Sequence, residues 1–240
     1  METVQLDKRL QSALQFVKNG ARLMDVGTDH AYLPIFLVQS GRVSAVLASD
    51  VKKGPVKRAA DNVERAGLSD KIEIRLTDGL DGASSFQPDH ITVFGMGGEM
   101  IVQILDRAPW VKDRHVRLIL QPMTHVWLVR QYLFANGFRI EGEVLSKEKK
   151  IYQTICAVYD GINREATEED IWAGTDCLRD SPYYKEFLKE QLKQMERIIS
   201  NIEKGGEKDA SFATLEELVR RRAAFEKRLQ MLEGKKDDSQ

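Results

Sequence analysis

The stretch that decides the fold is DVGTDHAYLP, residues 25–34. An apolar run ends at Val26, inside this stretch, and a second apolar run, Ile35–Val38, follows it. Gly27 and several polar residues separate the two runs, an order typical of a β-strand, a tight turn and an α-helix. In open α/β sheets such a turn lies at the carboxyl end of a strand, where nucleotide-like ligands bind. The stretch therefore predicts an α/β sheet with a ligand site at this turn.

The same alternation of strand-like and helix-like runs continues along the chain as far as Tyr159. Proline near the start and glycine just past the end mark the helix-like runs 34–41 and 55–67. Two consecutive strand-like runs, joined by the charged turn KEKK at residues 147–150, predict a β-hairpin. The expected strands cover about residues 22–26, 45–49, 71–76, 90–94, 116–121, 138–146 and 151–159, and further helices cover about 6–20, 98–107 and 124–137.

This layout predicts a mostly parallel sheet with one antiparallel strand at or near its edge. A seven-stranded sheet of this kind is the arrangement of the class I methyltransferase (Rossmann-like) fold, whose last strand returns antiparallel. Dinucleotide-binding sheets usually keep their sixth strand parallel. We therefore expect an α/β domain of the class I methyltransferase type.

After Gly161 the composition changes, and no strand pattern appears. Apolar residues instead recur at spacings of four and three in two segments, as they do along the seam of a coiled coil. A polar linker, GGEKDAS at residues 205–211, separates the segments, and Arg222 interrupts the second one. We expect an α/β domain at residues 1–161 and an α-helical coiled-coil hairpin at residues 162–240. The expected seam residues are Leu188, Leu192, Met195, Ile199 and Ile202, followed by Leu215, Leu218, Phe225, Leu229 and Leu232.

Two interpretations of this helical hairpin stay open. It is either an appendage for packing or dimerisation, or an arm that embraces a large substrate. Acids slightly outnumber bases in the segment, so the run Arg220–Arg222 is its one feature that favours RNA. A charge run of that length is usually a solvated helix face.

Length and composition bound the class of protein. The 240 residues, 42% hydrophobic and 30% charged, are typical of a soluble cytoplasmic protein with one full domain and a small appendage. Cys156 and Cys177 show no CxxC spacing, so we expect neither a disulfide framework nor a metal site. Residues 1–20 lack the apolar core of a signal peptide, and no apolar run approaches the roughly 20 residues that span a bilayer. We expect a cytoplasmic protein without membrane contact.

The formal net charge of −1 counts mildly against RNA binding, because nucleic-acid-binding proteins usually carry a basic excess on one face. Any contact with RNA therefore has to come from local patches. Each lysine or arginine in such a patch is equally well explained as a solvated side chain. The best patch is Lys52, Lys53, Lys57 and Arg58, after the second expected strand, and a second is Lys147, Lys149 and Lys150 in the hairpin turn.

Polar residues or glycines follow four of the expected strands. Gly27 and Gly95 follow the first and fourth, where the missing side chain lets a ligand approach the backbone. Asp50 follows the second strand, about twenty residues beyond Gly27. A carboxylate there can accept hydrogen bonds from the ribose hydroxyls of an adenosine. Asp78, next to Gly79 after the third strand, can accept from an adenine amino group. Together these residues predict one nucleoside across the carboxyl edge of the sheet.

Asp29 favours one nucleoside ligand over another. A pyrophosphate needs glycines at the second and third positions of the dinucleotide fingerprint, and Asp29 and Ala31 occupy those positions here. The carboxylate of Asp29 would repel a pyrophosphate but attract the cationic methionine part of S-adenosylmethionine. The turn therefore favours S-adenosylmethionine over NAD. His30 is either a contact to this ligand or a turn residue.

Six segments carry a resemblance to a known family: DVGTDHAYLP, SDVKKGPVKRAADNV, RLTDGL, FGMGGEMI, LILQP and KIYQTICAVY. They resemble the bacterial tRNA (adenine(22)-N1)-methyltransferases from about Leu6 to Tyr159, and the helical hairpin is similar in kind to that family's coiled-coil domain. One departure is visible. The family commonly has an asparagine after the Gln-Pro of the fifth strand, where this chain has Met123.

The resemblance implies methyl transfer from S-adenosylmethionine to N1 of an adenine in the D-arm of tRNA. By motif, the cofactor would lie against Gly27, Asp29, His30, Asp50, Asp78, Gly79 and Gly95. The main task of the enzyme is to align two reactants, because N1 of adenine is already an unprotonated nucleophile at neutral pH. A group near the N6 amino group would stabilise the charge that develops on the ring, and our candidates are Asp29 first and Gln121 second.

Two other functions remain alternatives. One is an S-adenosylmethionine-dependent methyltransferase for a small molecule or a protein. The other is a non-catalytic binding or dimerisation module, although the complete set of Gly27, Asp50 and Asp78 argues against it. We expect tRNA as the partner, no obligate protein partner, and a monomer or weak dimer.

Overall fold

The computed structural model describes residues 4–203 and 214–234. The chain divides into two compact units, residues 1–165 and 166–240, and each unit is described by itself. The expected linker at residues 205–211 lies outside the described residues.

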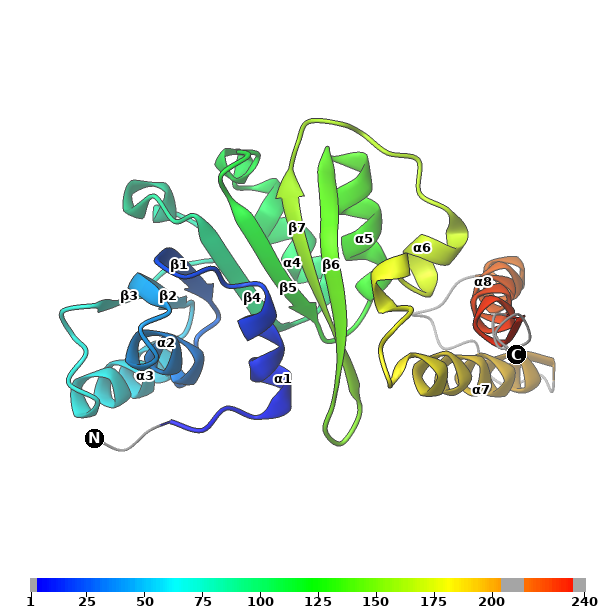
Figure 1. Ribbon diagram of the computed structural model, residues 1–240, viewed down its shortest axis with the longest axis horizontal. Helices are drawn as coiled ribbons and strands as arrows, with labels where there is room; N and C mark the ends of the chain where they lie inside the picture. The colour runs from blue at the N-terminus through cyan, green and yellow to red at the C-terminus, as the bar shows by residue number, and fades with distance from the viewer. Residues whose placement is uncertain (1–3, 204–213, 235–240) are drawn as a thin grey trace. The chain divides into compact units, whose positions relative to one another are not determined.

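The first unit is built on a seven-stranded sheet in the order β3-β2-β1-β4-β5-β7-β6 (Figure 1). Strands β1 to β5 are parallel to one another, and β7 lies antiparallel between β5 and β6. The predicted antiparallel strand near one edge of the sheet is therefore confirmed. The strands are β1 (Ala21–Val26), β2 (Val43–Asp50), β3 (Ile72–Leu76), β4 (His90–Met96), β5 (Arg117–Pro122), β6 (Phe138–Lys147) and β7 (Ile151–Tyr159).

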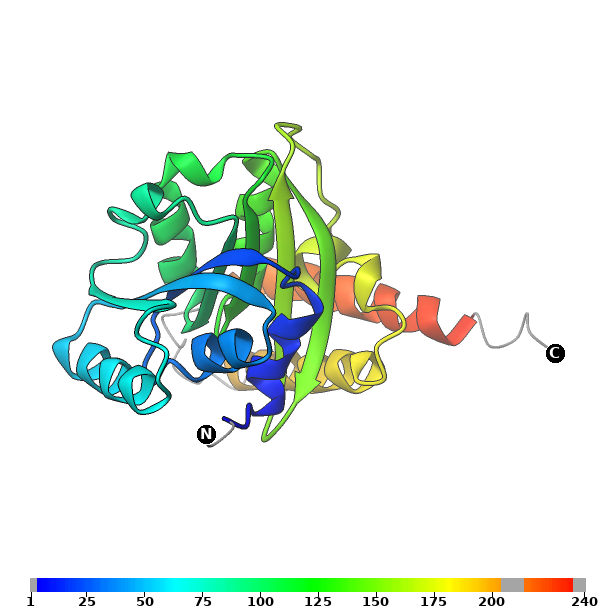
Figure 2. The same cartoon turned by 60° about the vertical axis from the view of Figure 1, so that its left-hand side comes forward.

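Helices cover both faces of this sheet. Figures 1 and 2 show α1, α2 and α3 (blue to cyan) on one face, and α4 and α5 (green) on the other. The helices are α1 (Lys8–Gln11), α2 (Tyr32–Gln39), α3 (Lys53–Arg65), α4 (Gly98–Asp106) and α5 (Val126–Ala135), with short 3₁₀-helices at η1 (Ser12–Gln15), η2 (Ala83–Phe86) and η3 (Pro109–Val111).

Strand β1 shows why both faces carry a core. Side chains of a strand alternate between faces, so Leu23 packs with α2 and α3 while Met24 packs with α4 and α5. Both side chains are fully buried. A strand covered on both sides reads as a nearly continuous apolar run, which is the pattern that precedes Gly27. Asp25 is the exception, because its carboxyl group is buried in this apolar strand.

The helices α2 and α3 begin two residues before the prolines that were expected to start them. Pro34 and Pro55 are each the third residue of their helix. Proline is tolerated throughout the first turn, because the N–H groups there have no partner within the helix. The two prolines therefore identify the helix starts only to within one turn.

The amino-terminal helix is shorter than the expected span of about 6–20. It consists of α1 and the 3₁₀-helix η1, and the chain leaves helical geometry before Val17. The carbonyl oxygen of Arg9 accepts from the side chains of Ser12 (2.6 Å) and Gln121 (3.1 Å). These side-chain donors compete with the backbone donors that would continue the α-helix.

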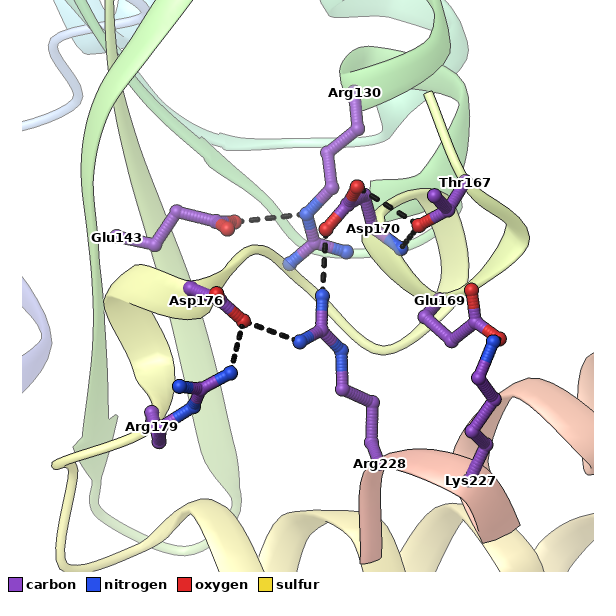
Figure 3. Close-up of polar contacts among 9 residues, drawn as sticks. All are labelled: Arg130, Glu143, Thr167, Glu169, Asp170, Asp176, Arg179, Lys227 and Arg228. Carbon is purple, nitrogen blue, oxygen red and sulfur yellow. Dashed lines mark hydrogen bonds and ion pairs between the residues drawn. The ribbon is translucent and has the colours of Figure 1, made fainter. Parts of the chain in front are cut away.

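Ion pairs stabilise both units, and Figure 3 shows a buried one in the first unit and a partly exposed group in the second. In the first unit, Nε of Arg130 donates to the carboxylate of Glu143 at 2.8 Å, and both side chains are essentially inaccessible to solvent. In the second unit, the guanidinium of Arg228 contacts the carboxylates of Asp170 (2.6 Å) and Asp176 (2.5 Å).

The second unit consists of α6 (Glu168–Trp172), the 3₁₀-helix η4 (Asp176–Leu178), α7 (Tyr184–Glu203) and α8 (Leu215–Gly234). Helices α7 and α8 pack against one another, and α6 packs on α8. The expected seam residues Leu188, Met195, Leu218 and Phe225 are buried, whereas Leu215, also expected in the seam, is exposed. The short helix α6 and the turn η4 were not expected from the pattern. No helix among the described residues is long and apolar enough to cross a membrane.

Candidate functional site

A cavity of about 840 Å³ opens at the carboxyl ends of β1, β2 and β4. Its wall is formed by the turn between β1 and α2, by the residues that follow β2 and β4, and by the amino-terminal segment at α1. Seven of the predicted site residues line it: Gly27, Asp29, His30, Asp50, Lys52, Arg58 and Gly95. The predicted residues Lys53, Lys57, Asp78, Gly79 and Gln121 do not line it.

Two glycines form turns in the cavity wall. Gly27 has a φ of +78° and Gly95 a φ of +80°, in the left-handed region that side chains rarely adopt. A Cβ atom on Gly27 would lie 2.4 Å from Cε of Met96, whereas one on Gly95 would meet no heavy atom within 4 Å. Both glycines thus keep backbone, without side chains, at the cavity surface.

Helix α3 holds the turn between β1 and α2 in place. Arg58 forms an ion pair with Asp29, and Nδ2 of Asn62 donates to the carbonyl oxygen of His30 at 2.9 Å. Ala31 has a φ of +55°, an unusual conformation for a residue with a side chain. Such strained positions persist only where surrounding contacts enforce them, and they cluster at functional sites.

Asp29 lies at the exposed part of the cavity wall. Its side chain is 56% exposed, and the hydrogen bond from Arg58 holds the pKa of its carboxyl below the usual range. Nε2 of His30 lies 3.3 Å from the same carboxylate. The carboxylate that was expected to face a cationic ligand therefore already has a cationic partner within the chain.

His30 also takes part in an aromatic stack. Its ring lies parallel to that of Tyr32, with a centroid distance of 5.1 Å and an interplanar angle of 8°. Tyr32 lines the cavity and is 44% exposed. Its aromatic surface at the cavity can receive a flat, apolar group such as a nucleobase. Tyr32 was not predicted from the sequence, because a tyrosine at the start of a helix gives no signal of its own.

Asp50 occupies the expected position at the end of β2. The backbone N–H of Lys52 donates to Oδ1 of Asp50 at 2.8 Å, and no ion pair joins this carboxylate to another described residue. Its oxygens therefore retain capacity to accept hydrogen bonds from a ligand in the cavity.

Asp25 is a functional candidate that was not predicted from the sequence. Its side chain lines the cavity, is 6% exposed and accepts from the hydroxyl of Thr92 at 2.6 Å. Burial raises the pKa of the Asp25 carboxyl to about 6, against the opposing effects of its hydrogen bonds and of Arg9. Strongly raised pKa values of this kind cluster at functional sites. The signal in the sequence was an acid inside an otherwise apolar strand.

Arg9 is the second candidate that was missed. It reaches the cavity from α1, and its side chain is 23% exposed. Its Nη1 atom donates to Oε1 of Gln121 at 3.2 Å, across 112 positions of the chain. No local pattern in the sequence indicates a contact over that distance.

Gln121 is placed differently from its expected role beside the target base. It is fully buried in β5, and its side chain contacts Arg9, Ser12 and Thr154. Nε2 donates to each of these residues and Oε1 accepts from Arg9. With its amide engaged in this network, Gln121 is suited to hold the amino-terminal segment against the sheet.

Asp78 and Gly79 lie after β3, outside the residues that line the cavity. Nη1 of Arg107 donates to the carboxylate of Asp78 at 2.9 Å, and this hydrogen bond lowers the pKa of that carboxyl. A Cβ atom on Gly79 would lie 3.1 Å from Ile104, and the next residue, Leu80, is buried in the core. Arg107 contacts one carboxylate oxygen of Asp78, whose side chain is 51% exposed, so the other oxygen retains capacity to accept a hydrogen bond.

The predicted basic patch is partly neutralised within the chain. Lys57 pairs with Asp61 at 2.8 Å, and Arg58 pairs with Asp29. Lys52 and Lys53 are exposed, and no ion pair joins either of them to a described residue. The patch therefore offers Lys52 and Lys53 as its freely available positive charges.

Comparisons with known proteins show the family to which the chain belongs. A family model described as a methyltransferase domain matches residues 6–155. The tRNA (adenine(22)-N(1))-methyltransferase of Bacillus subtilis is 36% identical over 174 residues, which cover 69% of this chain and 73% of that protein.

Solved structures extend the likeness to nearly the whole chain. The crystal structure of the Bacillus subtilis m1A22 tRNA methyltransferase is 27% identical, with a TM-score of 0.74, and the match covers 96% of this chain and 98% of that chain. Streptococcus pneumoniae Sp1610 in complex with S-adenosyl-L-methionine is 32% identical, with a TM-score of 0.80, over 94% of this chain and 100% of that one. The predicted class I methyltransferase fold is confirmed, and the chain belongs to the family of tRNA (adenine(22)-N1)-methyltransferases.

Proposed function

We propose that the protein transfers a methyl group from S-adenosylmethionine to N1 of adenine 22 in the D-arm of tRNA. The observation that carries the proposal is the cavity at the carboxyl edge of the sheet, where glycine turns and the carboxylates of Asp25 and Asp50 meet. Its relative from Bacillus subtilis bears the name of this activity.

The residues that line the cavity fit S-adenosylmethionine. A volume of about 840 Å³ is within the range of clefts that hold ligands of this size. Gly27 lines the cavity with backbone alone, and Asp50 offers carboxylate oxygens to ribose hydroxyls. The buried carboxylate of Asp25 offers a negative charge to the cationic methionine part.

The chemistry asks the chain mainly to position two reactants. The cofactor supplies an activated methyl group on a sulfonium, and N1 of adenine supplies the electron pair. Tyr32 offers a stacking surface beside the cofactor site, so it is our candidate to hold the target base. Aligned reactants gain the most when the groups around them are fixed, and α3 fixes this turn through Arg58 and Asn62.

Asp29 remains our first candidate for the residue that stabilises charge on the methylated ring. Its carboxylate is ionised and lies at the cavity wall next to the Tyr32–His30 stack. A negative charge in this position becomes more favourable as the ring gains positive charge. For Gln121 we propose a positioning role, because its amide is engaged with Arg9, Ser12 and Thr154.

We propose that the RNA backbone is contacted near the cavity by Lys52 and Lys53, whose charges no described partner neutralises. In the second unit, Arg221 pairs with Glu217 and lies over the ring of Trp172, and Arg222 pairs with Glu226. Of the run Arg220–Arg222, this leaves Arg220 as the better candidate for a phosphate. We also propose that the enzyme works in the cytoplasm, as a monomer or weak dimer without an obligate protein partner.

The test of the activity is transfer of a radiolabelled methyl group to unmodified tRNA transcripts. We expect label in a transcript with adenine at position 22 and none in a matched transcript with guanine there. Equal labelling of both transcripts would refute the position. Absence of label from every tRNA, together with label in a small-molecule or protein fraction of a cell extract, would replace tRNA by that substrate class.

The contribution of the second unit has its own test. We expect Arg220→Glu to weaken binding of tRNA without changing the affinity for S-adenosylhomocysteine, because the reversed charge repels phosphate. The matched control is Arg114→Glu, an exposed arginine of the first unit. Unchanged tRNA affinity in the Arg220 variant would favour a packing role for this helix face.

A further inference from the structure

The hairpin of β6 and β7 extends beyond the rest of the sheet. Strand β7 pairs with β5 over residues 155–158, whereas residues 151–154 pair with β6 and with no other described strand. Because β7 runs antiparallel to β5, this two-stranded end lies at the carboxyl ends of the parallel strands, the edge at which the cavity opens. Figures 1 and 2 show it (green) beside α1 (blue). A two-stranded ribbon is only marginally stable by itself.

The amino-terminal segment is fastened to this ribbon by hydrogen bonds at its tip and at its base. At the tip, the backbone N–H of Lys8 donates to Oε1 of Glu148 at 2.8 Å, across 140 positions of the chain. At the base, Oγ of Ser12 lies 2.7 Å from Oγ1 of Thr154, and both residues are buried. Lys8 is the first residue of α1, so Glu148 satisfies one of the N–H groups that have no partner within a helix.

The fastened segment is also a wall of the cavity. Asp7, Arg9 and Leu10, the neighbours of Lys8, line it. Helix α1 has only four residues, and a helix of that length is not stable by its own hydrogen bonds. Its position therefore depends on its contacts with the ribbon and with the buried Gln121. A change in the order of the ribbon thus reaches the wall of the cavity.

The tip of the ribbon presents lysines to solvent. Of the predicted patch in this turn, Lys149 and Lys150 are exposed, whereas Lys147 is half-buried at the end of β6. No ion pair joins Lys149 or Lys150 to a described residue, and Nζ of Lys150 lies 5.1 Å from the centroid of the Tyr152 ring. Glu148, the acid of the turn, is engaged at α1. The tip therefore offers lysine ammonium groups, which bind phosphates as point charges.

An RNA that places a base at the cavity brings its phosphates to this edge of the sheet. We propose that the hairpin tip binds the RNA backbone through Lys149 and Lys150, and that its contacts with α1 make the binding of RNA and of cofactor cooperative. RNA that holds the ribbon orders α1 in advance, so the cofactor no longer has to order this wall. Each ligand then raises the affinity of the other by the same factor. This inference rests on the proposed function, which supplies RNA as the partner.

The test of the coupling measures the affinity for S-adenosylhomocysteine by calorimetric titration of the full chain, with and without saturating unmodified tRNA transcript. For the wild-type chain we expect tRNA to raise this affinity by about fivefold, the lower end of typical couplings. Glu148→Ala removes the acceptor of the Lys8 N–H, so the factor should fall below about twofold. The factor is a ratio within one variant, so a general loss of affinity does not change it.

Glu148→Gln is the matched control, because it keeps an acceptor oxygen and should retain the wild-type factor. Thermal unfolding shows that both variants are folded. The inference is overturned by absence of coupling in the wild type or by an unchanged factor in Glu148→Ala. Loss of the factor in Glu148→Gln would assign the coupling to the charge of the tip and would contradict the hydrogen-bonded link to α1.

Hydrogen exchange gives a second measurement of the same link. We expect tRNA to slow exchange of the backbone amides of residues 8–16 in the wild type but not in Glu148→Ala. Exchange that tRNA leaves unchanged in the wild type would contradict the ordering of α1.

The lysines are tested by tRNA binding at several salt concentrations. We expect the double substitution Lys149→Ala and Lys150→Ala to weaken tRNA binding by about threefold to tenfold, the range for two exposed charge pairs. The slope of log affinity against log salt should become shallower by about one to two. Lys71→Ala, an exposed lysine before β3 at the opposite edge of the sheet, should change neither quantity. Unchanged affinity and slope in the double variant would overturn the contact.

Failure of the proposed function looks different from failure of this inference. In the first case the wild-type chain transfers no methyl group to any tRNA. In the second case methyl transfer to tRNA persists, and only the coupling or the contribution of the two lysines is missing.

Discussion

The cavity wall carries an acid and an arginine at two places: Asp25 and Arg9 at its inner end, and Asp29 and Arg58 at its outer rim. The two places differ in burial and in pairing. At the inner end, Asp25 is buried and Arg9 is held by a buried amide. At the rim, Asp29 and Arg58 pair with each other while each is about half exposed to solvent. A charge in water is screened and is worth little to a ligand, whereas a buried one interacts strongly. We therefore expect discrimination between cofactors to come from the inner end of the cavity.

The largest expected effect concerns the stability of the ligand-free protein. Burial raises the pKa of Asp25 from 3.8 to about 6, so the folded state binds a proton more tightly than the unfolded state does. The stability that this proton provides is present below about pH 4 and is lost as the pH rises through about 6. At pH 8, we expect Asp25→Asn to raise the free energy of unfolding by about 3 kcal/mol, because no buried charge remains.

Urea unfolding at pH 8 and pH 4 measures this effect. The variant should gain stability over wild type at pH 8 and lose that gain at pH 4, where Asp25 is protonated. A variant that is less stable than wild type at pH 8 would show that other groups of the chain stabilise the negative charge of Asp25. The difference between a buried, unpaired acid at the inner end and a paired acid at the rim would then disappear.

Asp50 lies between the two ends of the comparison, since it is half-buried at the end of β2. We expect Asp50→Ala to weaken binding of S-adenosylhomocysteine by about 1–3 kcal/mol, the scale of a lost hydrogen bond to a charged group. Calorimetric titration measures the loss. Asp61→Ala removes an exposed carboxylate of α3 and serves as the control. Wild-type affinity in the Asp50 variant would refute the ribose assignment.

The pH dependence of cofactor binding separates Asp25 from the rim. An ammonium favours ionised Asp25, so below about pH 6 binding must first remove a proton from it. We expect the affinity for S-adenosylhomocysteine to fall by up to about tenfold per pH unit below pH 6. Because the pKa of Asp29 is already below its usual range, that residue stays ionised there. Asp25→Asn should bind more weakly and abolish the pH dependence, and a dependence that survives in this variant would assign it to another group.

The local parts of the architecture were predictable, because they follow from short-range patterns. Strand β7 has the predicted bounds, since a charged turn and an apolar run define a hairpin without reference to the rest of the chain. Gly27 and Gly95 were predicted for the same reason, because each glycine directly follows a strand-like run. Both have a positive φ in the structure. The helix starts at Pro34 and Pro55 were less certain, because proline fits any position of a first turn.

The inner end of the cavity was not predictable, because it is made by distant parts of the chain. Arg9 and Gln121 meet across 112 positions, and no periodicity links them. Asp25 stood in the most informative stretch of the sequence, yet its raised pKa depends on burial by elements far along the chain. Asp29 led to the prediction of S-adenosylmethionine because it replaces a glycine of the dinucleotide-binding fingerprint. The ion pair with Arg58 that neutralises it becomes visible only in three dimensions.

The smallest expected effect is that of Asp29 on cofactor affinity. It tests directly whether the exposed rim contributes less to cofactor binding than the buried inner end. Exposed ion pairs typically contribute less than about 1 kcal/mol, so Asp29→Asn should change the dissociation constant for S-adenosylhomocysteine by no more than about fivefold. Its effect should fall instead on the rate of methyl transfer to tRNA, because the proposed role of this carboxylate is to stabilise positive charge on the methylated ring. Titration and single-turnover kinetics, with Asp61→Asn as the exposed control, separate the two effects. A large loss of cofactor affinity with an unchanged rate would move Asp29 to the cofactor and leave the target base without its carboxylate.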